Sequence, residues 1–439
     1  NLQWRSMYLL YSGLLAAALV VSVPWWLARM ILQGRHRRGL RERLGQVPAR
    51  LGDASGCIWI HAVSVGEVLA VSGLMTELRA HFPGRRVLVS TTTDTGQKLA
   101  RERFGENNVF YYPIDFAFAI RPYLRALRPE LIVLAESEFW PNFLRLARRS
   151  GARIAVVNTR ISDRSLPRYA RLHVLWRRVL NTMDLFLAQS EEDARRLRLI
   201  GAPEACVKVT GNLKFDVEAP KAQPGVEMLR RVLQTASTVV VCGSTAEGEE
   251  EIVLRAFRGV LERHPRAALI LAPRRPERFE TVAGMLAQSG MKYWRKSQLM
   301  GNESLSGGVV LLDTIGELAA LYALASVAFV GGSLAPRGGH NILEPAQFGV
   351  ATMVGPHTEN FRDIVAIFER ERAVKVVTAQ EFAAELLRLL DDANARRELG
   401  RRAAAVVQQQ RGATQRTIQE LEKLLTAPAA MPQHEHAQR

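Results

Sequence analysis

The stretch ASVAFVGGSLAPRGGHNILEPAQFG, residues 325–349, contains the pattern that decides the fold of this chain. It opens with a short apolar run, continues through a loop with four glycines between residues 331 and 339, and enters a helix-forming run at Asn341 whose first turn holds Glu344. A strand, a Gly-rich loop and a helix start in this order are typical of nucleotide-binding α/β sheets. Because free backbone N–H groups at a helix start attract anions, the segment predicts a site for a phosphate-bearing ligand.

The same alternation of apolar strands and amphipathic helices runs through most of the chain after residue 43. The predicted strands are residues 57–63, 86–91, 131–136, 154–158, 185–189 and 207–211 in the first half, and 238–244, 267–273, 308–314, 325–332, 351–356 and 373–378 in the second. Strands as apolar as these are buried on both faces, as in parallel sheets covered by helices. The sequence therefore predicts an α/β protein with two Rossmann-like sheets that face a cleft, where ligands bind at the carboxyl ends of the strands.

Chain length and one polar, proline-containing segment predict the domain organisation. A chain of 439 residues is too long for one ordinary domain. The alternation lapses in a polar segment broken by two prolines, which we interpret as a linker. The predicted parts are a membrane anchor with a basic collar over residues 1–45, a first domain over 46–215, a linker over 216–236, a second domain over 237–425, and a disordered tail over 426–439.

Charge and cysteine content narrow the class of partner. The 59 Lys and Arg residues exceed the 43 Asp and Glu residues, and the net charge of +16 favours nucleic acid, acidic lipid or a phosphorylated substrate as partner. Cys57, Cys206 and Cys242 are odd in number and far apart, which predicts reduced thiols in a reducing compartment. The histidines show neither HExxH nor paired ligand spacing, so we expect no metal ion.

The N-terminal segment predicts a membrane anchor. Residues 6–28 carry no charge, and their number exceeds the roughly 20 residues that cross a bilayer. Trp25 and Trp26 stand where an interfacial belt belongs, and a basic collar with Arg35, Arg37 and Arg38 follows at once. Positive charge after the span places the remainder of the chain in the cytoplasm. The alternative is a buried amphipathic helix with a basic, solvated end.

In the first half, polar residues follow several predicted strands. Glu67 comes after Ser64 and Gly66 at the end of the first strand, where a doubly wound domain exposes side chains to its ligand. A carboxylate there could take a proton from a hydroxyl nucleophile, although the Ser64–Glu67 spacing equally fits a helix cap. Glu136 ends another strand. Lys214 lies in a turn, where it is either an exposed lysine or a cation that offsets charge on a leaving phosphate.

The second half supplies residues suited to an anion. Arg274 follows a strand, Gly316 and Glu317 follow another, and the position of Arg274 favours contact with an anion over simple solvation. His340 fits a hydrogen-bonded loop histidine as well as it fits a ligand contact. In the first half, by contrast, we expect Glu138 to be solvent-facing or structural. The Gly-rich loop matches neither GxGxxG nor GxxxxGK[ST], so neither a dinucleotide site nor a P-loop is supported.

Six motifs, in a fixed order after the apolar N-terminal segment, carry a family resemblance. They are HAVSVGE (61–67), ESEFWPN (136–142), TGNLKFD (210–216), APRRPERF (272–279), DTIGEL (313–318) and GGSLAPRGGHNILEPA (331–346). Together they resemble the lipid A Kdo transferases (3-deoxy-D-manno-octulosonic acid transferases), and the likeness runs from the anchor to about residue 410. It implies a GT-B glycosyltransferase of two Rossmann-like domains, in which the second domain holds CMP-Kdo and the first receives the lipid A precursor.

The resemblance also implies a mechanism and a location. Transfer inverts the anomeric carbon without a metal or other cofactor, and it contributes to the core of lipopolysaccharide on the cytoplasmic side of the inner membrane, with the N-terminal segment as a single-pass anchor. Glu67 becomes the general base for the acceptor hydroxyl, and Glu136 and Lys214 support the transition state. On the acceptor and membrane side are Ser64, Gly66, Arg35, Arg37 and Arg38. The positions that match CMP contacts are Pro273, Arg274, Ile315, Gly316, Glu317, Gly339, His340, Asn341, Ile342, Leu343 and Glu344.

Two alternatives from other classes stay open at this point. One is a membrane-associated GT-B glycosyltransferase that uses a UDP-sugar. The other is a membrane-tethered nucleic-acid binder, suggested by the net charge alone. Such a binder needs basic residues interleaved with aromatic ones, a pattern that the sequence lacks outside the N-terminal collar, so we expect no nucleic-acid partner.

Overall fold

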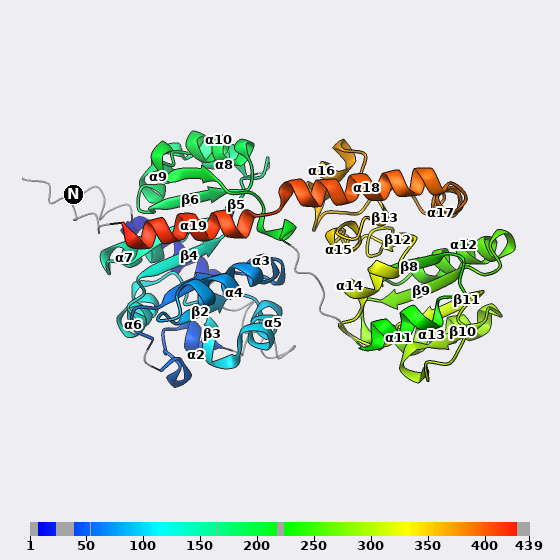
Figure 1. Ribbon diagram of the computed structural model, residues 1–439. Helices are drawn as coiled ribbons and strands as arrows, with labels where there is room; N and C mark the ends of the chain where they lie inside the picture. The colour runs from blue at the N-terminus through cyan, green and yellow to red at the C-terminus, as the bar shows by residue number, and fades with distance from the viewer. Residues whose placement is uncertain (1–7, 23–38, 53, 164, 217–223, 428–439) are drawn as a thin grey trace, which may run out of the picture. The chain divides into compact units, whose positions relative to one another are not determined.

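The computed structural model describes residues 8–22, 39–52, 54–163, 165–216 and 224–427. The chain divides into two compact units: unit 1 comprises residues 1–216 with 412–439, and unit 2 comprises residues 217–411. Each unit contains one seven-stranded parallel sheet with helices packed around it (Figure 1). The predicted α/β class with two Rossmann-like sheets is confirmed.

The sheet of unit 1 has the strand order β3-β2-β1-β4-β5-β6-β7. Its strands are β1 (Ile58–His61), β2 (Val87–Thr91), β3 (Val109–Tyr111), β4 (Leu131–Ala135), β5 (Arg153–Thr159), β6 (Leu185–Ala188) and β7 (Val207–Val209). Its helices are α2 (Leu40–Arg43), α3 (Val65–Ala70), α4 (Ser72–His81), α5 (Asp94–Phe104), α6 (Ala117–Leu127), α7 (Pro141–Arg149), α8 (Leu166–Arg171), α9 (His173–Leu180), α10 (Glu191–Leu199) and α19 (Ala413–Thr426).

Alternating side chains of the strands enter two separate cores, one on each face of this sheet. In β1, Ile58 and Ile60 belong to one core, whereas Trp59 belongs to the other. Trp59 is level with Leu88 on β2 and Ile132 on β4, and all three side chains are fully buried. Apolar residues on both faces leave no solvated side, which explains why the strands read as continuous apolar runs.

The sheet of unit 2 has the strand order β10-β11-β9-β8-β12-β13-β14 and likewise two cores. Its strands are β8 (Val239–Thr245), β9 (Ala268–Pro273), β10 (Tyr293–Arg295), β11 (Gly308–Leu311), β12 (Val327–Val330), β13 (Ala351–Val354) and β14 (Lys375–Val376). Its helices are α11 (Pro224–Val232), α12 (Glu249–Arg263), α13 (Phe279–Ser289), α14 (Leu318–Leu321), α15 (Leu343–Ala346), α16 (Arg362–Arg370), α17 (Phe382–Asp391) and α18 (Ala393–Gln410).

Two short strands, β3 and β10, were not expected from the sequence. Each has three residues and stands at the edge of its sheet, where it pairs with a single neighbour. A run of three residues is too short to produce the alternation or the long apolar run by which a strand is recognised. The predicted strand over 373–378 is shorter than expected for a related reason, because β14 is an edge strand of two exposed residues.

The C-terminal helix corrects the predicted end of the second domain at residue 425. α19 belongs to unit 1, where Ile418 and Leu421 are buried in the same core as Leu74. The carboxylate of Asp216 accepts the backbone N–H of Gly412 at 2.7 Å, which fixes the chain as it enters α19. The amphipathic pattern of α19 shows that one face is buried, but it does not show which sheet covers that face.

The predicted linker over 216–236 is also too long. α11 buries Val226, Leu229 and Val232 in a core of unit 2, so the chain joins the second sheet from Pro224 onward. Because the segment is polar and contains two prolines, the predicted linker included α11, whose apolar face has only these few positions.

The last part of the predicted basic collar is folded onto unit 1. The carboxylate of Glu42, in α2, accepts the backbone N–H of Tyr111 at 2.8 Å and forms an ion pair with Arg50 at 2.7 Å. The guanidinium of Arg43 lies 4.4 Å from the centroid of the Tyr111 ring. Residues 40–43 therefore cover the β3 edge of the sheet, and the first folded unit begins before residue 46.

Residues 8–22 of the predicted anchor form a helix that contacts unit 1. The side-chain amide of Asn142 donates to the hydroxyl of Ser12 at 2.9 Å, and the guanidinium of Arg145 lies 4.5 Å from the ring centroid of Tyr8. Within the described part of the chain, no helix has both the length and the apolar character needed to cross a bilayer. Outside the described residues lie the rest of the predicted span, most of the tail, and Arg35, Arg37 and Arg38. The membrane anchor stays a prediction.

We expect Leu421→Ala to lower the free energy of unfolding by about 2–5 kcal/mol, because it leaves a cavity in a fully buried cluster. In native-state hydrogen exchange, faster exchange should be confined to unit 1, including β5, which contacts α19. Glu422→Ala, one residue along on the exposed face of the same helix, is the matched control and should change little. Faster exchange in the strands of unit 2 instead would contradict the assignment of α19 to unit 1.

Candidate active site

The predicted base, Glu67, lies in the first turn of α3, directly after the carboxyl end of β1. Its side chain is buried. One carboxylate oxygen accepts the backbone N–H of Val63 at 2.8 Å, and the other accepts the hydroxyl of Ser64 at 3.0 Å. Ser64 is the N-cap residue, but its hydroxyl makes no capping bond to the helix backbone. The carboxylate is thus held at a fixed position at the end of the sheet rather than in the predicted capping box.

The electrostatic environment of Glu67 favours its protonated form at acidic pH. Burial is the main cause that raises the pKa of Glu67 to about 7; the hydrogen bond from Val63 opposes this shift, and the negative charges of Glu136 and Glu138 add to it. A carboxyl group with a pKa near the working pH is suited to accept a proton from a hydroxyl. The structure therefore brings the predicted base together with both acids of the ESEFWPN motif.

Glu136 and Lys214 form an ion pair. The Nζ atom of Lys214 lies 3.2 Å from Oε1 of Glu136, and both side chains are partly exposed. Glu136 has a positive φ of 59° just after β4, and its backbone N–H donates to the carbonyl of Val157 at 2.9 Å. A left-handed conformation in a residue other than glycine is unfavourable, so the neighbouring strand must hold it. Lys214, expected to be either an exposed lysine in a turn or a cation at the site, is a partly exposed cation paired with Glu136.

A network of three amide side chains, which the sequence did not reveal, positions the turn that carries Lys214. The amide of Asn212 donates to Gln189 at 3.0 Å, and that of Gln189 donates to the backbone carbonyl of Asn158 at 2.9 Å. Asn158 accepts the backbone N–H of Leu213 at 2.9 Å, and Asn212 accepts that of Lys214 at 3.0 Å. The only sequence hint was an amide residue at the end of each of three consecutive predicted strands or turns.

Of the two roles expected for Glu138, solvent-facing or structural, the structure supports the structural one. One of its carboxylate oxygens accepts the indole N–H of Trp140 at 3.0 Å, and burial raises the pKa of Glu138. Trp140 packs against the core of unit 1, and Pro141 is the first residue of α7.

In unit 2, the Gly-rich loop after β12 is wrapped around one buried carboxylate, that of Glu249. This side chain is fully buried at the start of α12. Its oxygens accept backbone N–H groups from one residue after β8 and from four consecutive loop residues: Ala246 at 2.8 Å, Gly332 at 2.7 Å, Ser333 at 2.9 Å, Leu334 at 2.7 Å and Ala335 at 3.1 Å. Five such bonds satisfy a charge that would otherwise be costly to bury.

This contact explains two of the glycines that opened the sequence analysis. A Cβ atom on Gly331 would lie 2.7 Å from Cα of Thr245 and 2.8 Å from Oε2 of Glu249, so only glycine fits there. Gly332 has a positive φ of 68°, which favours glycine as well. The helix expected at Asn341 is limited to the four residues of α15, so its dipole is smaller than the sequence suggested. The predicted contact of this loop with a nucleotide stays a prediction.

Around α15, three of the residues that were predicted to contact CMP affect one another electrostatically. Arg274 is exposed just after β9, and its positive charge acts on both His340 and Glu344. Burial, assisted by Arg274, lowers the pKa of His340 to about 4, so the imidazole is neutral at pH 7. Burial raises the pKa of Glu344, whose carboxylate lies 3.5 Å from the side-chain nitrogen of Asn341. This corner of unit 2 combines one free-standing cation with a neutral imidazole and a partly shielded carboxyl.

The remaining residues that were predicted to contact CMP differ in whether their side chains or only their backbone atoms are accessible to a ligand. Glu317 forms an ion pair with Lys296 at 2.7 Å and accepts the hydroxyl of Thr314, whereas Ile315 beside it is 78% exposed. The side chains of Pro273, Ile342 and Leu343 are buried, so those positions present only backbone atoms to a ligand. Gly316 and Gly339 have positive φ values of 93° and 73°, which are backbone conformations that favour glycine.

The cysteines and potential metal ligands add no further centre. Cys57, Cys206 and Cys242 are free thiols, in keeping with the expected absence of a disulfide framework. Over the described ranges, His, Cys, Asp and Glu side chains do not gather in threes as a metal site requires. The predicted independence of a metal ion stays a prediction.

Comparison with known proteins identifies the family. A family profile described as 3-deoxy-D-manno-octulosonic-acid transferase (kdotransferase) matches residues 38–217. The 3-deoxy-D-manno-octulosonic acid transferase of Haemophilus influenzae is 32% identical over 396 residues, which cover 89% of this chain and 92% of that protein. The chain belongs to the Kdo transferase family. The enzyme of the same description from Bordetella pertussis is 37% identical over 400 residues, or 86% of this chain and 91% of that one.

Solved structures show the same fold. A UDP-N-acetylglucosamine 2-epimerase from Neisseria meningitidis superposes with a TM-score of 0.53 at 12% identity, covering 84% of this chain and all of that one. A similar protein from Listeria monocytogenes gives a TM-score of 0.53 at 13% identity, covering 85% and 97%. The GT-B architecture predicted from the motifs is therefore confirmed, and membership of the Kdo transferase family confirms the predicted glycosyltransferase class. The nucleic-acid alternative is set aside.

We expect Glu249→Gln to loosen the Gly-rich loop, because an amide presents N–H donors where the backbone already supplies only donors. Unfolding of unit 2 should become easier by about 1–3 kcal/mol, and amide exchange at residues 332–335 should accelerate. Glu251→Gln, an exposed acid in the same helical turn, is the control and should alter neither. Unchanged protection of residues 332–335 would contradict the role of Glu249.

The raised pKa of Glu67 predicts a pH-dependent stability. Because the folded pKa of about 7 exceeds the ordinary value of 4.5, the stabilising contribution of Glu67 is present below pH 4.5 and is lost as the pH rises through 7. Glu67→Gln removes this loss. Urea titrations give the unfolding free energy of the variant minus that of wild type. Between pH 5 and pH 8, this difference should therefore rise by roughly 1–3 kcal/mol. Glu102→Gln, on the exposed face of α5, should gain nothing; an equal gain in this control would refute the assignment.

Proposed function

We propose that this enzyme transfers Kdo from CMP-Kdo to a hydroxyl of a lipid A precursor, with inversion at the anomeric carbon. Unit 1 receives the acceptor and unit 2 binds the donor nucleotide. Membership of the Kdo transferase family supports the transferred sugar. The observation that carries the mechanism is the buried carboxyl of Glu67, whose pKa of about 7 suits a general base.

The proposed step needs only groups that this chain supplies and the two substrates. The acceptor hydroxyl gives its proton to Glu67 while its oxygen forms a bond to the anomeric carbon of Kdo. The bond from that carbon to the phosphate oxygen breaks, and CMP leaves with the bonding electron pair. Because phosphate is already a good leaving group, the enzyme has to position the alcohol, take one proton and stabilise the charge on CMP.

We infer separate roles for the cations of the two units. Lys214 pairs with Glu136 at 3.2 Å, so it limits the repulsion between that carboxylate and Glu67 and stays available to an anion because it is partly exposed. Arg274 stands exposed at the end of β9, next to neutral His340, where a nucleotide phosphate would meet its positive charge. We propose that Glu344 accepts hydrogen bonds from ribose hydroxyls.

We further propose that the enzyme acts at the cytoplasmic surface of the inner membrane, where its amphiphilic acceptor is found. The helix over residues 8–22 exposes Leu9, Leu10, Val20 and Val21, each to more than 60%. Exposed apolar residues in this number favour contact with lipid. The basic residues of the collar would add attraction to anionic headgroups.

Transfer to a tetraacylated, bisphosphorylated lipid A precursor in detergent tests the proposal, with CMP-Kdo generated in place and EDTA present. We expect product from wild type and a loss of at least about 100-fold in kcat for Glu67→Ala, because general bases contribute about 10²–10⁴-fold. The calorimetric affinity for CMP should be unchanged in the variant. Below pH 7, log kcat/KM of wild type should rise with pH and then level off.

Glu102→Ala is the matched control for this assay and should keep wild-type transfer. Equal loss of CMP binding and transfer in Glu67→Ala would mean that Glu67 maintains the fold instead of acting as base. Tighter binding of UDP than of CMP to wild type would favour a UDP-sugar donor. No product from a folded wild type that binds CMP would leave the GT-B architecture in place and exclude the proposed acceptor.

A further inference from the structure

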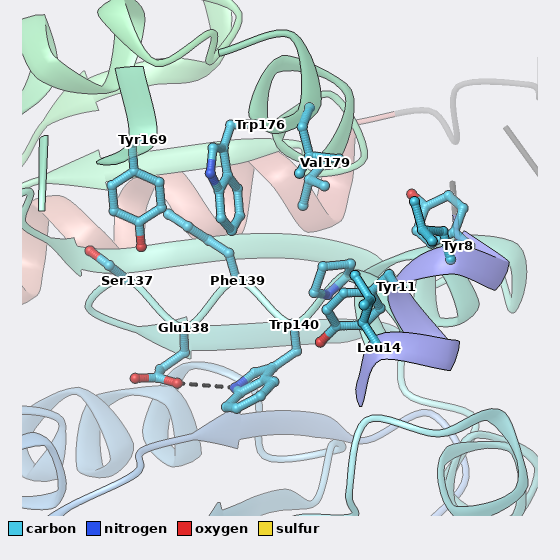
Figure 2. Close-up of a pocket in the computed structure, with 13 residues that line it drawn as sticks. Tyr8, Tyr11, Leu14, Ser137, Glu138, Phe139, Trp140, Tyr169, Trp176 and Val179 are labelled. Atoms are coloured by element: carbon cyan, nitrogen blue, oxygen red, sulfur yellow. Dashed lines mark hydrogen bonds between the residues drawn. The ribbon is translucent and has the colours of Figure 1, made fainter. Parts of the chain in front are cut away.

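Unit 1 contains a cavity of about 460 Å³ that the motifs did not predict. Its walls come from three parts of the chain: the helix over residues 8–22, the loop between β4 and α7, and the helices α8 and α9 (Figure 2). The apolar and aromatic side chains that line it include Leu14, Phe139, Trp140, Tyr169, Leu175 and Trp176. A volume in the range of roughly 300–1,000 Å³ is typical of sites that bind small molecules.

An aromatic cluster makes the inner wall rigid. The ring centroids of Tyr169 and Trp176 are 4.8 Å apart, and the ring of Phe139 lies 6.2 Å from the first and 6.1 Å from the second. Figure 2 shows Phe139 directed toward Tyr169 and Trp176, while Glu138 and Trp140 leave the loop on its other side. On the opposite side, Tyr8 and Tyr11 of the N-terminal helix line the cavity.

The chemistry of the lining excludes several classes of occupant. Lys, Arg and His are absent from the residues that line the cavity, and Glu138 is the single charged side chain among them. A phosphate or other anion would therefore meet a negative charge with no cation to offset it. A sugar would find few hydrogen-bond partners on walls of leucine and aromatic rings. An uncharged, apolar chain fits this surface, because the walls can exclude water from it.

The position of the cavity connects it to the candidate active site. Ser137 and Glu138 line the cavity and follow Glu136 directly in the chain. The charge of Glu138 raises the pKa of Glu67, so the rim of the cavity is within electrostatic reach of the proposed base. A molecule with an apolar chain in the cavity would hold its polar end near the carboxylates.

The N-terminal helix extends the apolar surface from the cavity toward solvent. Leu10 and Leu14 line the cavity and are nevertheless 67% and 64% exposed, and Leu9 is exposed beside them. An apolar chain could therefore pass from a lipid phase into the cavity along one continuous surface. This continuity favours a lipid as the source of the occupant over a freely dissolved small molecule.

We propose that this cavity binds one acyl chain of the lipid acceptor and thereby positions the acceptor hydroxyl next to Glu67. The proposal rests on the function proposed above, since it names the part of the same acceptor that unit 1 recognises. Each methylene that the cavity removes from water should improve apparent affinity about fourfold, so the chain contributes to KM more than to kcat.

The test compares two acceptors and four forms of the full-length protein in detergent. The acceptors are the tetraacylated, bisphosphorylated precursor and the same disaccharide with every acyl chain removed. The proteins are wild type, Leu175→Glu and Leu14→Glu, which bring a charge into the cavity from two different segments, and Val174→Glu as control. Val174 is adjacent to Leu175 on α9, is 65% exposed and does not line the cavity.

We expect the two cavity variants to raise KM for the acylated acceptor at least tenfold with little change in kcat. Their kinetics with the deacylated acceptor should equal those of wild type, and Val174→Glu should match wild type with both acceptors. Equal losses with both acceptors, or no change in KM for the acylated one, would overturn the proposal. Two variants on separate segments guard against misfolding of either one.

A binding measurement separates this proposal from the proposed function. Trp140 and Trp176 line the cavity, so dodecan-1-ol brominated near its methyl end should quench tryptophan fluorescence in wild type and Val174→Glu, but much less in Leu175→Glu. If wild type transfers Kdo to neither acceptor, the proposed function fails, and this measurement still decides whether the cavity binds an acyl chain. Equal quenching in all forms would refute binding in the cavity. Suppose that quenching is as expected but the cavity variants change KM equally for the acylated and deacylated acceptors. The cavity would then be assigned to some other lipid, and its link to the acceptor would be overturned.

Discussion

The structure depends on the burial of both faces of each parallel sheet. With helices packed on both sides, the strand interiors have no access to water, and charged groups cannot remain there without many partners. His61 illustrates the constraint: it is fully buried in β1, stacks on Tyr112 with ring centroids 3.8 Å apart, and burial lowers its pKa to about 3, so it is neutral. Polar groups that must keep a charge are left with the loops at the strand ends. The candidate site residues of both units lie at these strand ends, in the loops or in the first turns of the helices that follow.

The two units differ in how far the charge of a buried acid at a strand end is compensated by hydrogen bonds. In unit 2, five backbone N–H groups converge on Glu249 and compensate its charge, which makes the carboxylate a structural anchor. In unit 1, Glu67 has one backbone donor and one hydroxyl and shares its surroundings with Glu136 and Glu138. Its charge is poorly compensated, and its pKa is raised to about 7. An acid with full backbone compensation fixes a loop, whereas one that lacks it is suited to exchange protons.

Strained backbone accompanies both arrangements. Five described residues other than glycine have a positive φ, and three of them, Glu136 after β4, Asn158 in β5 and Ser244 in β8, lie close to the carboxyl ends of central strands. Each such residue costs on the order of 1–3 kcal/mol, which the surrounding hydrogen bonds must offset. Asn158 is held through Leu213 and Gln189, and Glu136 through Val157. The geometry of the site is thus maintained by the buried strands beside it.

The sequence predicted the features that depend on local pattern. Continuous apolar runs predicted both sheets. Their positions at or near strand ends singled out Glu67, Glu136, Lys214 and Arg274 as candidate site residues. Glu249 was missed because three consecutive acids start α12, and only the three-dimensional path of a loop more than 80 residues later shows which of them the loop wraps around. The place of α19 and the cavity beside Trp176 were missed for the same reason. Both arise from contacts between distant segments, which leave no periodicity in the chain.

The return of α19 to unit 1 makes that unit discontinuous, with unit 2 as an insertion between Asp216 and Gly412. During synthesis from the N-terminus, the ribosome releases the whole of unit 2 before the helix that completes the core of unit 1. Until then, the surface that Ile418 and Leu421 later cover stays open to solvent on a largely formed sheet. The core of the base-bearing unit therefore becomes complete only after α19 has left the ribosome, although most of its sheet is synthesised before unit 2.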